Sequence, residues 1–123
     1  MNEITLPPAL SQELSAVYRE MESQYDSLAA SLGLNCNGCP DNCCDSYFLH
    51  YTYSEWAYLW EGLRALEPDA LEQTRARSRN YVAACRQDLA RGERPRIMCP
   101  LNEEGLCIIY THRLMICRLH GVP

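Results

Sequence analysis

The chain contains no lysine, and all eleven of its basic residues are arginine. The missing lysine excludes a Schiff-base mechanism, a lysine nucleophile and a phosphate-binding loop of the usual form. The chain also has neither a G-x-G-x-x-G nor a G-x-S-x-G sequence. A dinucleotide-binding fold and a hydrolase with a serine nucleophile therefore have no support. The eight cysteines are left as the main candidates for chemistry.

Positive charge and long apolar runs are also scarce. The formal net charge of −5 argues against general binding to nucleic acid. No apolar run is long enough to span a membrane, and the start of the chain lacks the basic and apolar parts of a secretory signal. We therefore expect a cytoplasmic protein whose thiols stay reduced. A chain of 123 residues predicts a single domain over 1–123.

Seven of the eight cysteines fall into two groups, which have the form C-x2-C-x3-C-C and C-x7-C-x9-C. A C-x2-C turn brings two sulfurs to one ion, and a distant segment supplies further ligands. An even number of cysteines also allows four disulfides, but disulfide-dense scaffolds are usually shorter and poorer in long helices. The grouping therefore predicts a metal site whose ligands are Cys36, Cys39, Cys43, Cys44, Cys99, Cys107 and Cys117.

The number of thiols leaves the metal open. A tetrahedral zinc and a [4Fe–4S] cluster each take four thiolates, so seven thiols exceed one site of either kind. Soft sulfur ligands favour zinc, Cu(I) or an iron–sulfur cluster over magnesium or calcium. Neighbouring side chains point in different directions, so Cys43 and Cys44 either reach different metals or include one spare thiol. The expected cofactor is zinc or iron, and an iron–sulfur cluster is one form that bound iron can take.

Residues 8–32 predict one amphipathic helix. Pro7 and Pro8 suit a first turn, and Gly33 is a natural end. We expect the apolar stripe to face the core, with a coiled-coil dimer as the alternative, although about three heptads are few for an independent one. The stripe, with residues three or four positions apart, comprises Leu10, Leu14, Val17, Met21, Tyr25, Leu28 and Leu32, with Tyr18 beside it.

Two further helices are predicted. The second begins near Thr52 or Ser54, where Thr52 and Glu55 fit a capping box. The third runs from about Pro68 to Arg91 and ends at Gly92. The apolar face of the second helix comprises Trp56, Leu59, Trp60 and Leu63. The partial stripe of the third comprises Leu71, Tyr81, Val82, Cys85 and Leu89, and we interpret its cysteine as a small buried hydrophobe.

Aromatic and basic residues gather in different parts of the chain. The aromatic residues lack the basic neighbours that base stacking needs, so we expect them to form a packed core around the cysteine loop. The aromatic group comprises Tyr47, Phe48, Tyr51, Tyr53 and Tyr58.

Seven arginines lie within 75–96, and Arg75, Arg79 and Arg86 share one helix face. Such runs of charge usually form a solvated helix face. The alternative is that this face binds the acidic surface of a partner protein, so that the chain acts as an adaptor.

The segment 99–118 is predicted to be short and irregular. A turn at 102–105 joins two extended pieces, of which the second is 106–110. Thr111 would then cap a short helix that carries the last cysteine. A lone histidine is more often structural than a ligand, so the predicted ligand set omits His50, His112 and His120. The whole pattern predicts a mainly α fold of about three helices, with irregular cysteine-bearing segments at 36–44 and 99–118.

Together, the two cysteine motifs resemble those of the YkgJ-type cysteine-cluster proteins, a family of zinc- or iron-chelating domains. The segment Cys36-Asn37-Gly38-Cys39-Pro40-Asp41-Asn42-Cys43-Cys44 is similar to the family's CxxCxxCC signature, with one more residue between its second and third cysteines. The second part is similar to the family's CP-L…G-x-C-x-I-Y-x-x-R-P-x-x-C-R stretch, with Leu114 in place of the proline. It comprises Cys99-Pro100-Leu101, Gly105-Leu106-Cys107-Ile108-Ile109-Tyr110, Arg113 and Cys117-Arg118.

The resemblance implies that the seven grouped cysteines are the ligands, with Tyr110, Arg113 and Arg118 as supporting residues. It implies a small metal-binding module, structural or chelating. A redox or metal-dependent enzyme is the alternative, although no H-x-E or H-E-x-x-H pattern supplies a base. The expected partners are a metal ion and, through the arginine face, a protein. Neither nucleic acid nor a membrane is expected, and the oligomeric state is left open.

Overall fold

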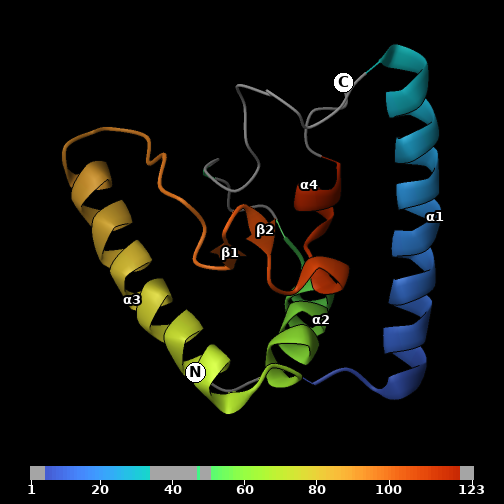
Figure 1. The fold of residues 1–123 in the computed structure, drawn as a ribbon, viewed down its shortest axis with the longest axis horizontal. Coiled ribbons are helices and arrows are strands. Elements are labelled where there is room, and N and C mark those ends of the chain that lie inside the picture. The colour runs from blue at the N-terminus through green and yellow to red at the C-terminus, as the bar shows by residue number, and fades with distance from the viewer. Residues whose placement is uncertain (1–4, 34–46, 48–50, 120–123) are drawn as a thin grey trace.

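The computed structural model describes residues 5–33, 47 and 51–119, and this part of the chain is mainly helical, as the sequence predicts. Figure 1 shows the long helices α1 and α3 on the two sides of the molecule, with α2 and α4 between them. In chain order the elements are α1 (Pro8–Leu32), α2 (Tyr53–Arg64), α3 (Pro68–Ala90), β1 (Asn102–Glu103), β2 (Leu106–Cys107), the 3-10 helix η1 (Tyr110–His112) and α4 (Met115–Arg118).

Helix α1 has the predicted boundaries. Its first residue is Pro8, where a missing backbone N–H breaks no helical hydrogen bond. It ends at Gly33, which has a positive φ of 69° and donates its N–H to the carbonyls of Ala29 and Ala30. A glycine adopts this left-handed conformation without a steric penalty, which explains why the helix stops there.

The apolar stripe of α1 faces the core only in part. Tyr18 is only 2% exposed, whereas four stripe residues keep between 42% and 53% of their surface exposed. The prediction fails for these four because the side of α1 that meets the rest of the protein is centred on Tyr18 and Glu22, whose contacts are aromatic and ionic. The exposed stripe residues are Leu10, Val17, Leu28 and Leu32.

Helix α2 begins with the predicted capping box. Thr52 Oγ1 accepts a hydrogen bond from the Glu55 backbone N–H at 3.2 Å, and a Glu55 carboxylate oxygen accepts one from the Thr52 backbone N–H at 2.8 Å. The predicted apolar face is also confirmed. Leu59 and Leu63 join Ile109 and Leu114 in a buried cluster, hereafter the central cluster. The residues of the predicted face that pack partly buried against it are Trp56 and Trp60.

The expected aromatic core forms only in part. Tyr58 is buried and meets Tyr18 edge to face at a centroid distance of 5.5 Å. Tyr51 and Tyr53 are exposed, which corrects the prediction for these two. They lie at the N-terminal end of α2, where Tyr51 stacks on Trp56. Phe48 and the loop 34–46 that was expected beside them lie outside the described residues.

Helix α3 also has nearly the predicted bounds. It ends as predicted near Gly92, whose φ is 74°, and the Glu93 N–H closes the end by donating to the Asp88 carbonyl at 2.9 Å. Cys85 is buried, as expected of a small hydrophobe, but Val82 and Leu89 of the same predicted stripe are exposed. The buried side instead includes Thr74, because α3 contacts the C-terminal segment through polar groups.

The C-terminal segment forms a tight hairpin at the predicted turn. Strands β1 and β2 are antiparallel, with Asn102 opposite Cys107 and Glu103 opposite Leu106. Both central turn residues have positive φ, 53° at Glu104 and 88° at Gly105. This pair of values defines the primed turn whose twist suits a two-residue hairpin.

Two details of this segment differ from the prediction. The second strand ends at Cys107 instead of residue 110, because the chain turns into η1 three residues later. The short helix that carries Cys117 is present as α4, but its N-cap is Leu114 instead of Thr111. Thr111 lies in η1, where its hydroxyl contacts the ring of His112. The backbone N–H groups of α4 therefore need another acceptor.

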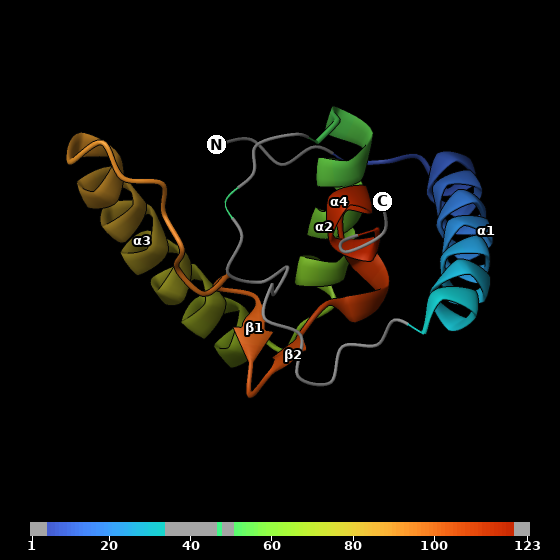
Figure 2. The same cartoon turned by 90° about the horizontal axis from the view of Figure 1, so that it is seen from above.

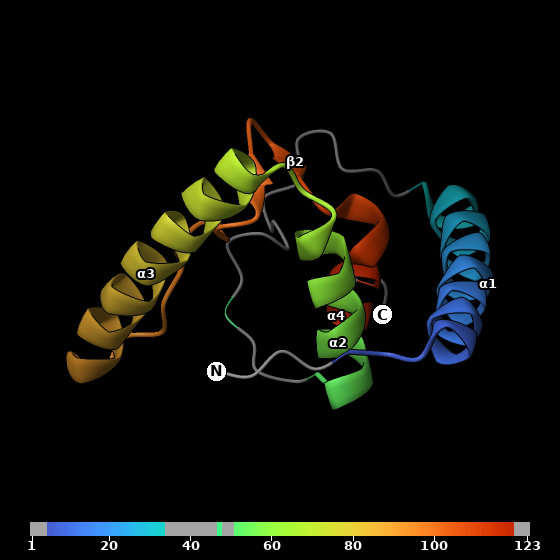
Figure 3. The same ribbon diagram turned by 90° about the horizontal axis from the view of Figure 1, so that it is seen from below.

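Figure 2 and Figure 3, seen from above and below, also place α1 and α3 on opposite sides of α2. The hairpin and α4 lie beside α2, so segments distant in sequence form the centre of the molecule. Within the described residues, no helix combines the length and the apolar character that crossing a membrane requires.

Candidate functional site

Three of the seven predicted metal ligands, Cys99, Cys107 and Cys117, lie in the described part of the chain, and each is half-buried. Among the described side chains, no group of three or more histidine, cysteine, aspartate or glutamate residues is arranged to hold a metal ion. A full set of thiolate ligands would therefore need the first cysteine motif. Its four cysteines, Cys36, Cys39, Cys43 and Cys44, lie outside the described residues.

Cys99 occupies a turn that suits a thiolate. The Leu101 backbone N–H donates to Cys99 Sγ at 3.4 Å, and the Asn102 N–H donates to the Cys99 carbonyl at 3.0 Å. An N–H directed at a sulfur stabilises negative charge on it, and the thiolate is the form of cysteine that binds metals. The residue types at this turn, Cys99-Pro100-Leu101, are those that carry the family resemblance.

The hairpin brings Cys107 back toward this turn. Cys107 lies opposite Asn102, three positions from Cys99, and the Ile108 N–H donates to the Leu101 carbonyl at 2.9 Å. Cys107 also lines an open pocket of about 360 Å³ between η1 and the C-terminal half of α2. Backbone hydrogen bonds therefore hold the two segments that carry these predicted ligands.

Cys117 is held by α4 and packs against the central cluster. Its neighbour Arg118 is buried and lies over the ring of Tyr18, with the guanidinium carbon 3.9 Å from the ring centroid. Cys117 also belongs to the groups that raise the pKa of Tyr18. The structure therefore places this third thiol on the side of the central cluster that meets α1.

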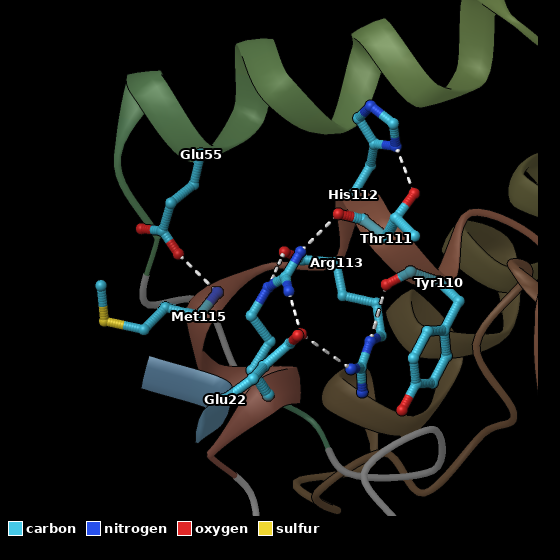
Figure 4. A network of polar contacts seen from close by, with 8 residues as sticks. Glu22, Glu55, Tyr110, Thr111, His112, Arg113 and Met115 are labelled. Atoms are coloured by element: carbon cyan, nitrogen blue, oxygen red, sulfur yellow. Dashed lines mark hydrogen bonds and ion pairs between the residues drawn. The ribbon is translucent and has the colours of Figure 1, made fainter. Parts of the chain in front are cut away.

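The two arginines predicted to support the site bind the same carboxylate on α1. The Glu22 carboxylate pairs with the guanidinium groups of Arg118 and Arg113, the latter at 3.4 Å. Figure 4 shows Glu22 and Arg113 joined in this way. Arg118 also donates to the carbonyls of Arg113 and Thr111 at 2.9 and 2.6 Å. Arg113 covers the ring of Tyr110 at 3.7 Å. The described contacts of both arginines thus hold the C-terminal segment together and attach it to α1.

Glu55 is a second anchor, which sequence reasoning identified only as part of a cap. One of its carboxylate oxygens accepts the Thr52 N–H, and the other accepts the Met115 N–H at 2.8 Å (Figure 4). The same buried side chain therefore caps α2 and supplies the acceptor that the first turn of α4 needs. The capping box indicated that Glu55 would be ordered, whereas its bond to residue 115 had no sequence signal.

His112 has a packing role in the described structure. Its ring stacks on Tyr58 at a centroid distance of 4.5 Å, and Nε2 lies 3.6 Å from a carboxylate oxygen of Glu61. Gly62 makes room for it, since an added Cβ would lie 2.7 Å from His112 Cβ. Burial lowers the pKa of His112 despite the opposing influence of Glu61. These contacts fit its omission from the predicted ligand set.

The hydroxyl of Tyr18 is buried and has no hydrogen-bond partner among the described residues. Burial, and next the Glu55 carboxylate, raise the pKa of Tyr18 to about 12, so the hydroxyl keeps its proton. A buried donor without an acceptor is rare and costly, and its neighbours include Cys117. Two observations fit a metal bound by thiolates, which are soft ligands. The Tyr18 hydroxyl has no acceptor among the described residues, and the Leu101 N–H is directed at the sulfur of Cys99.

The chain matches no protein-family model, no curated protein and no solved structure. Its function is therefore argued from its own residues.

Proposed function

We propose that this protein is a small cysteine-cluster module that binds zinc or iron through thiolates, in a structural or chelating role. The observation that carries the proposal is the turn at Cys99, where the Leu101 N–H lies 3.4 Å from the sulfur. A backbone donor at this position suits a charged sulfur, which a cysteine in a purely apolar role would not need. The resemblance to the cysteine-cluster family supports the same conclusion.

The ligands come from both cysteine motifs. The second motif contributes Cys99 from the turn before the hairpin, Cys107 from β2 and Cys117 from α4. The first motif contributes its four cysteines, whose C-x2-C spacing suits two ligands on one ion. A bound zinc or iron would supply strong bonds that join the two motifs, and the free energy of these bonds would add to that of folding.

A role without catalysis is part of the proposal, because the chain has no H-x-E or H-E-x-x-H pattern to supply a base. Arg113 and Arg118 share the Glu22 carboxylate, and Glu55 accepts two backbone N–H groups. These two carboxylates therefore hold the C-terminal segment in place. A cytoplasmic location follows from the proposal, because metal binding requires cysteines that stay reduced.

Elemental analysis and an absorption spectrum of protein purified without oxygen test the proposal. We expect near-stoichiometric zinc without visible absorption, or iron with the visible absorption of thiolate-bound iron. Cys99→Ser and Cys107→Ser should lose most of the metal, because each removes one of the proposed thiolate ligands. Cys85→Ala is the matched control and should keep it, since Cys85 is a buried residue of α3. Wild-type protein without metal, or Cys99→Ser protein with full metal, would contradict the proposal.

A further inference from the structure

One face of α1 combines exposed apolar residues with glutamates. Leu10, Val17 and Leu28 are 49%, 51% and 42% exposed, and Glu13 and Glu20 are exposed beside them. These positions are three, four or eight residues apart, so they share one side of the helix. The contacts that dock α1, made by Tyr18 and Glu22, leave this face uncovered in the described structure.

One face of α3 has the opposite charge and the same apolar character. Val82 and Leu89 are 44% and 48% exposed, and Arg75, Arg79 and Arg86 are exposed on the same side. Arg79 lies 3.5 Å from Glu72, a pair in which both side chains are largely exposed and which therefore contributes little to stability. Three arginines and two apolar side chains thus form an accessible stripe.

The two faces match residue by residue when the helices are antiparallel. Apolar residues then meet apolar residues, and each glutamate meets an arginine. The two residue numbers of every pair total 99, so a single register produces all of the matches. The pairs are Leu10 with Leu89, Glu13 with Arg86, Val17 with Val82, Glu20 with Arg79, Gln24 with Arg75, and Leu28 with the half-buried Leu71.

The two faces do not meet within one molecule. Figures 1, 2 and 3 all show α2 between α1 and α3. Both long helices run in the same general direction in Figure 1, so a second copy turned end over end presents each of them antiparallel to its match. We propose that the exposed face of α1 in one copy binds the exposed face of α3 in a second copy.

Several physical terms favour this pairing. Burial of the apolar side chains removes them from water, and opposite charges beside them select the register. Antiparallel helices also place the positive end of one dipole beside the negative end of the other. Because the contact joins two different faces, it is heterologous, and each copy that binds through α1 still presents its own α3 face to a further copy. The pairing does not depend on the proposed metal.

Sedimentation velocity over a dilution series of the full chain tests the pairing, with the metal content held constant. We expect wild-type protein to form an assembly larger than the monomer. Glu13→Arg with Glu20→Arg, and separately Arg79→Glu with Arg86→Glu, replace attraction by repulsion. Each double variant should weaken self-association on the order of tenfold or more. Arg19→Glu with Asp26→Arg is the control, because both residues are exposed on another side of α1.

Charge exchange separates the pairing from net charge and from folding. The variant with all four substitutions has the wild-type net charge and restores opposite charges, so it should associate again. An equal mixture of the two double variants should also associate, because the basic α1 of one matches the acidic α3 of the other. Circular dichroism checks that each variant keeps its helices. A wild-type monomer at every concentration, or no recovery in the folded fourfold variant, would overturn the proposal.

Discussion

The two sides of α2 are joined to the rest of the molecule in different ways. Toward the C-terminal segment, Leu59 and Leu63 meet Ile109 and Leu114 in a buried apolar cluster. Toward α1, by contrast, the contacts are made by Tyr18, by the Glu22 carboxylate and by a hydrogen bond from Ser11 to Glu61 at 2.8 Å. In an apolar cluster, the stabilising free energy is the sum of many weak atomic contacts. In a polar contact, by contrast, the loss of either partner leaves the other without a hydrogen bond or a counter-charge.

The largest effect is expected in the central cluster. Leu63→Ala should lower the free energy of unfolding by about 3 kcal/mol, because it removes buried methyl groups and leaves a cavity. Chemical denaturation measures this loss. Leu106→Ala is the control, since Leu106 is 71% exposed and should change stability by less than about 0.5 kcal/mol. Equal losses of unfolding free energy in the two variants would show that the central cluster contributes no more to stability than an exposed residue does.

The next effect is expected at the anchor of α1. Glu22→Gln keeps the shape of the side chain but removes the charge that faces Arg113 and the buried Arg118. We expect a loss of about 2 kcal/mol, because a buried guanidinium then lacks a counter-charge. Hydrogen exchange should locate faster opening in α1 and leave α2 protected. Exposed Asp26→Asn is the control, because it removes a negative charge from α1 outside both contacts, and uniform loss of protection throughout the protein would contradict the assignment.

A smaller effect is expected where α2 meets η1. Gly62→Ala adds a Cβ only 2.7 Å from His112 Cβ, so one element must shift, at a cost of about 1–3 kcal/mol. His112→Ala keeps the His112 Cβ but removes the ring atoms Cγ and Nδ1, which would lie 2.7 and 3.0 Å from the new Cβ, and so relieves part of the clash. In a double-mutant cycle, the glycine substitution should therefore cost less in that background than in the wild type. Additive effects would mean that the contact does not constrain the two elements.

The same contact predicts a dependence on pH. Burial lowers the pKa of His112 below 6.5, so the unfolded chain binds a proton more readily than the folded one. The stability due to neutral His112 is fully present above pH 6.5 and is lost as the pH falls through the lower, folded value. Melting temperatures between pH 5 and 8 measure this loss. The loss should be smaller in His112→Gln, and an unchanged profile would assign it to other groups.

The smallest effect is expected at Tyr18. Tyr18→Phe removes a hydroxyl that has no partner among the described residues, so the metal-free protein should keep its stability or gain up to about 1 kcal/mol. If the hydroxyl donates to a metal-bound cysteine, the same substitution should weaken metal binding. Unfolding measured with and without metal separates the two effects. A clear loss of stability in the metal-free protein would show that the hydroxyl has a partner there.

Much of the secondary structure follows from residues close together in the chain. Pro8 and Gly33 mark the ends of α1, the Thr52–Glu55 capping box starts α2, and Gly92 follows α3. The turn of the hairpin was likewise predicted at 102–105. Such signals work because a terminal N–H or carbonyl finds its partner within a few residues.

The candidate site is less predictable from sequence. The cysteine motifs predict the ligands, and the structure places Cys99 in the turn before the hairpin and Cys107 in its second strand. The anchors around it were missed, because Glu22 lies in the middle of a helix and its partner Arg118 is 96 positions away. Periodicity also placed Leu10 and Val17 in the core, although they are exposed. A repeat of three and four residues identifies an apolar face but not what covers it.

The sequence by itself determined which segments become helices, where they end, and that seven thiols lie in two motifs suited to a soft metal. Only the tertiary structure decided that α1 docks through Tyr18 and Glu22 and leaves part of its apolar stripe exposed. The reason is the range of the forces involved. Helix ends depend on backbone groups that neighbouring residues satisfy, whereas burial depends on contacts between segments that only the complete fold brings together.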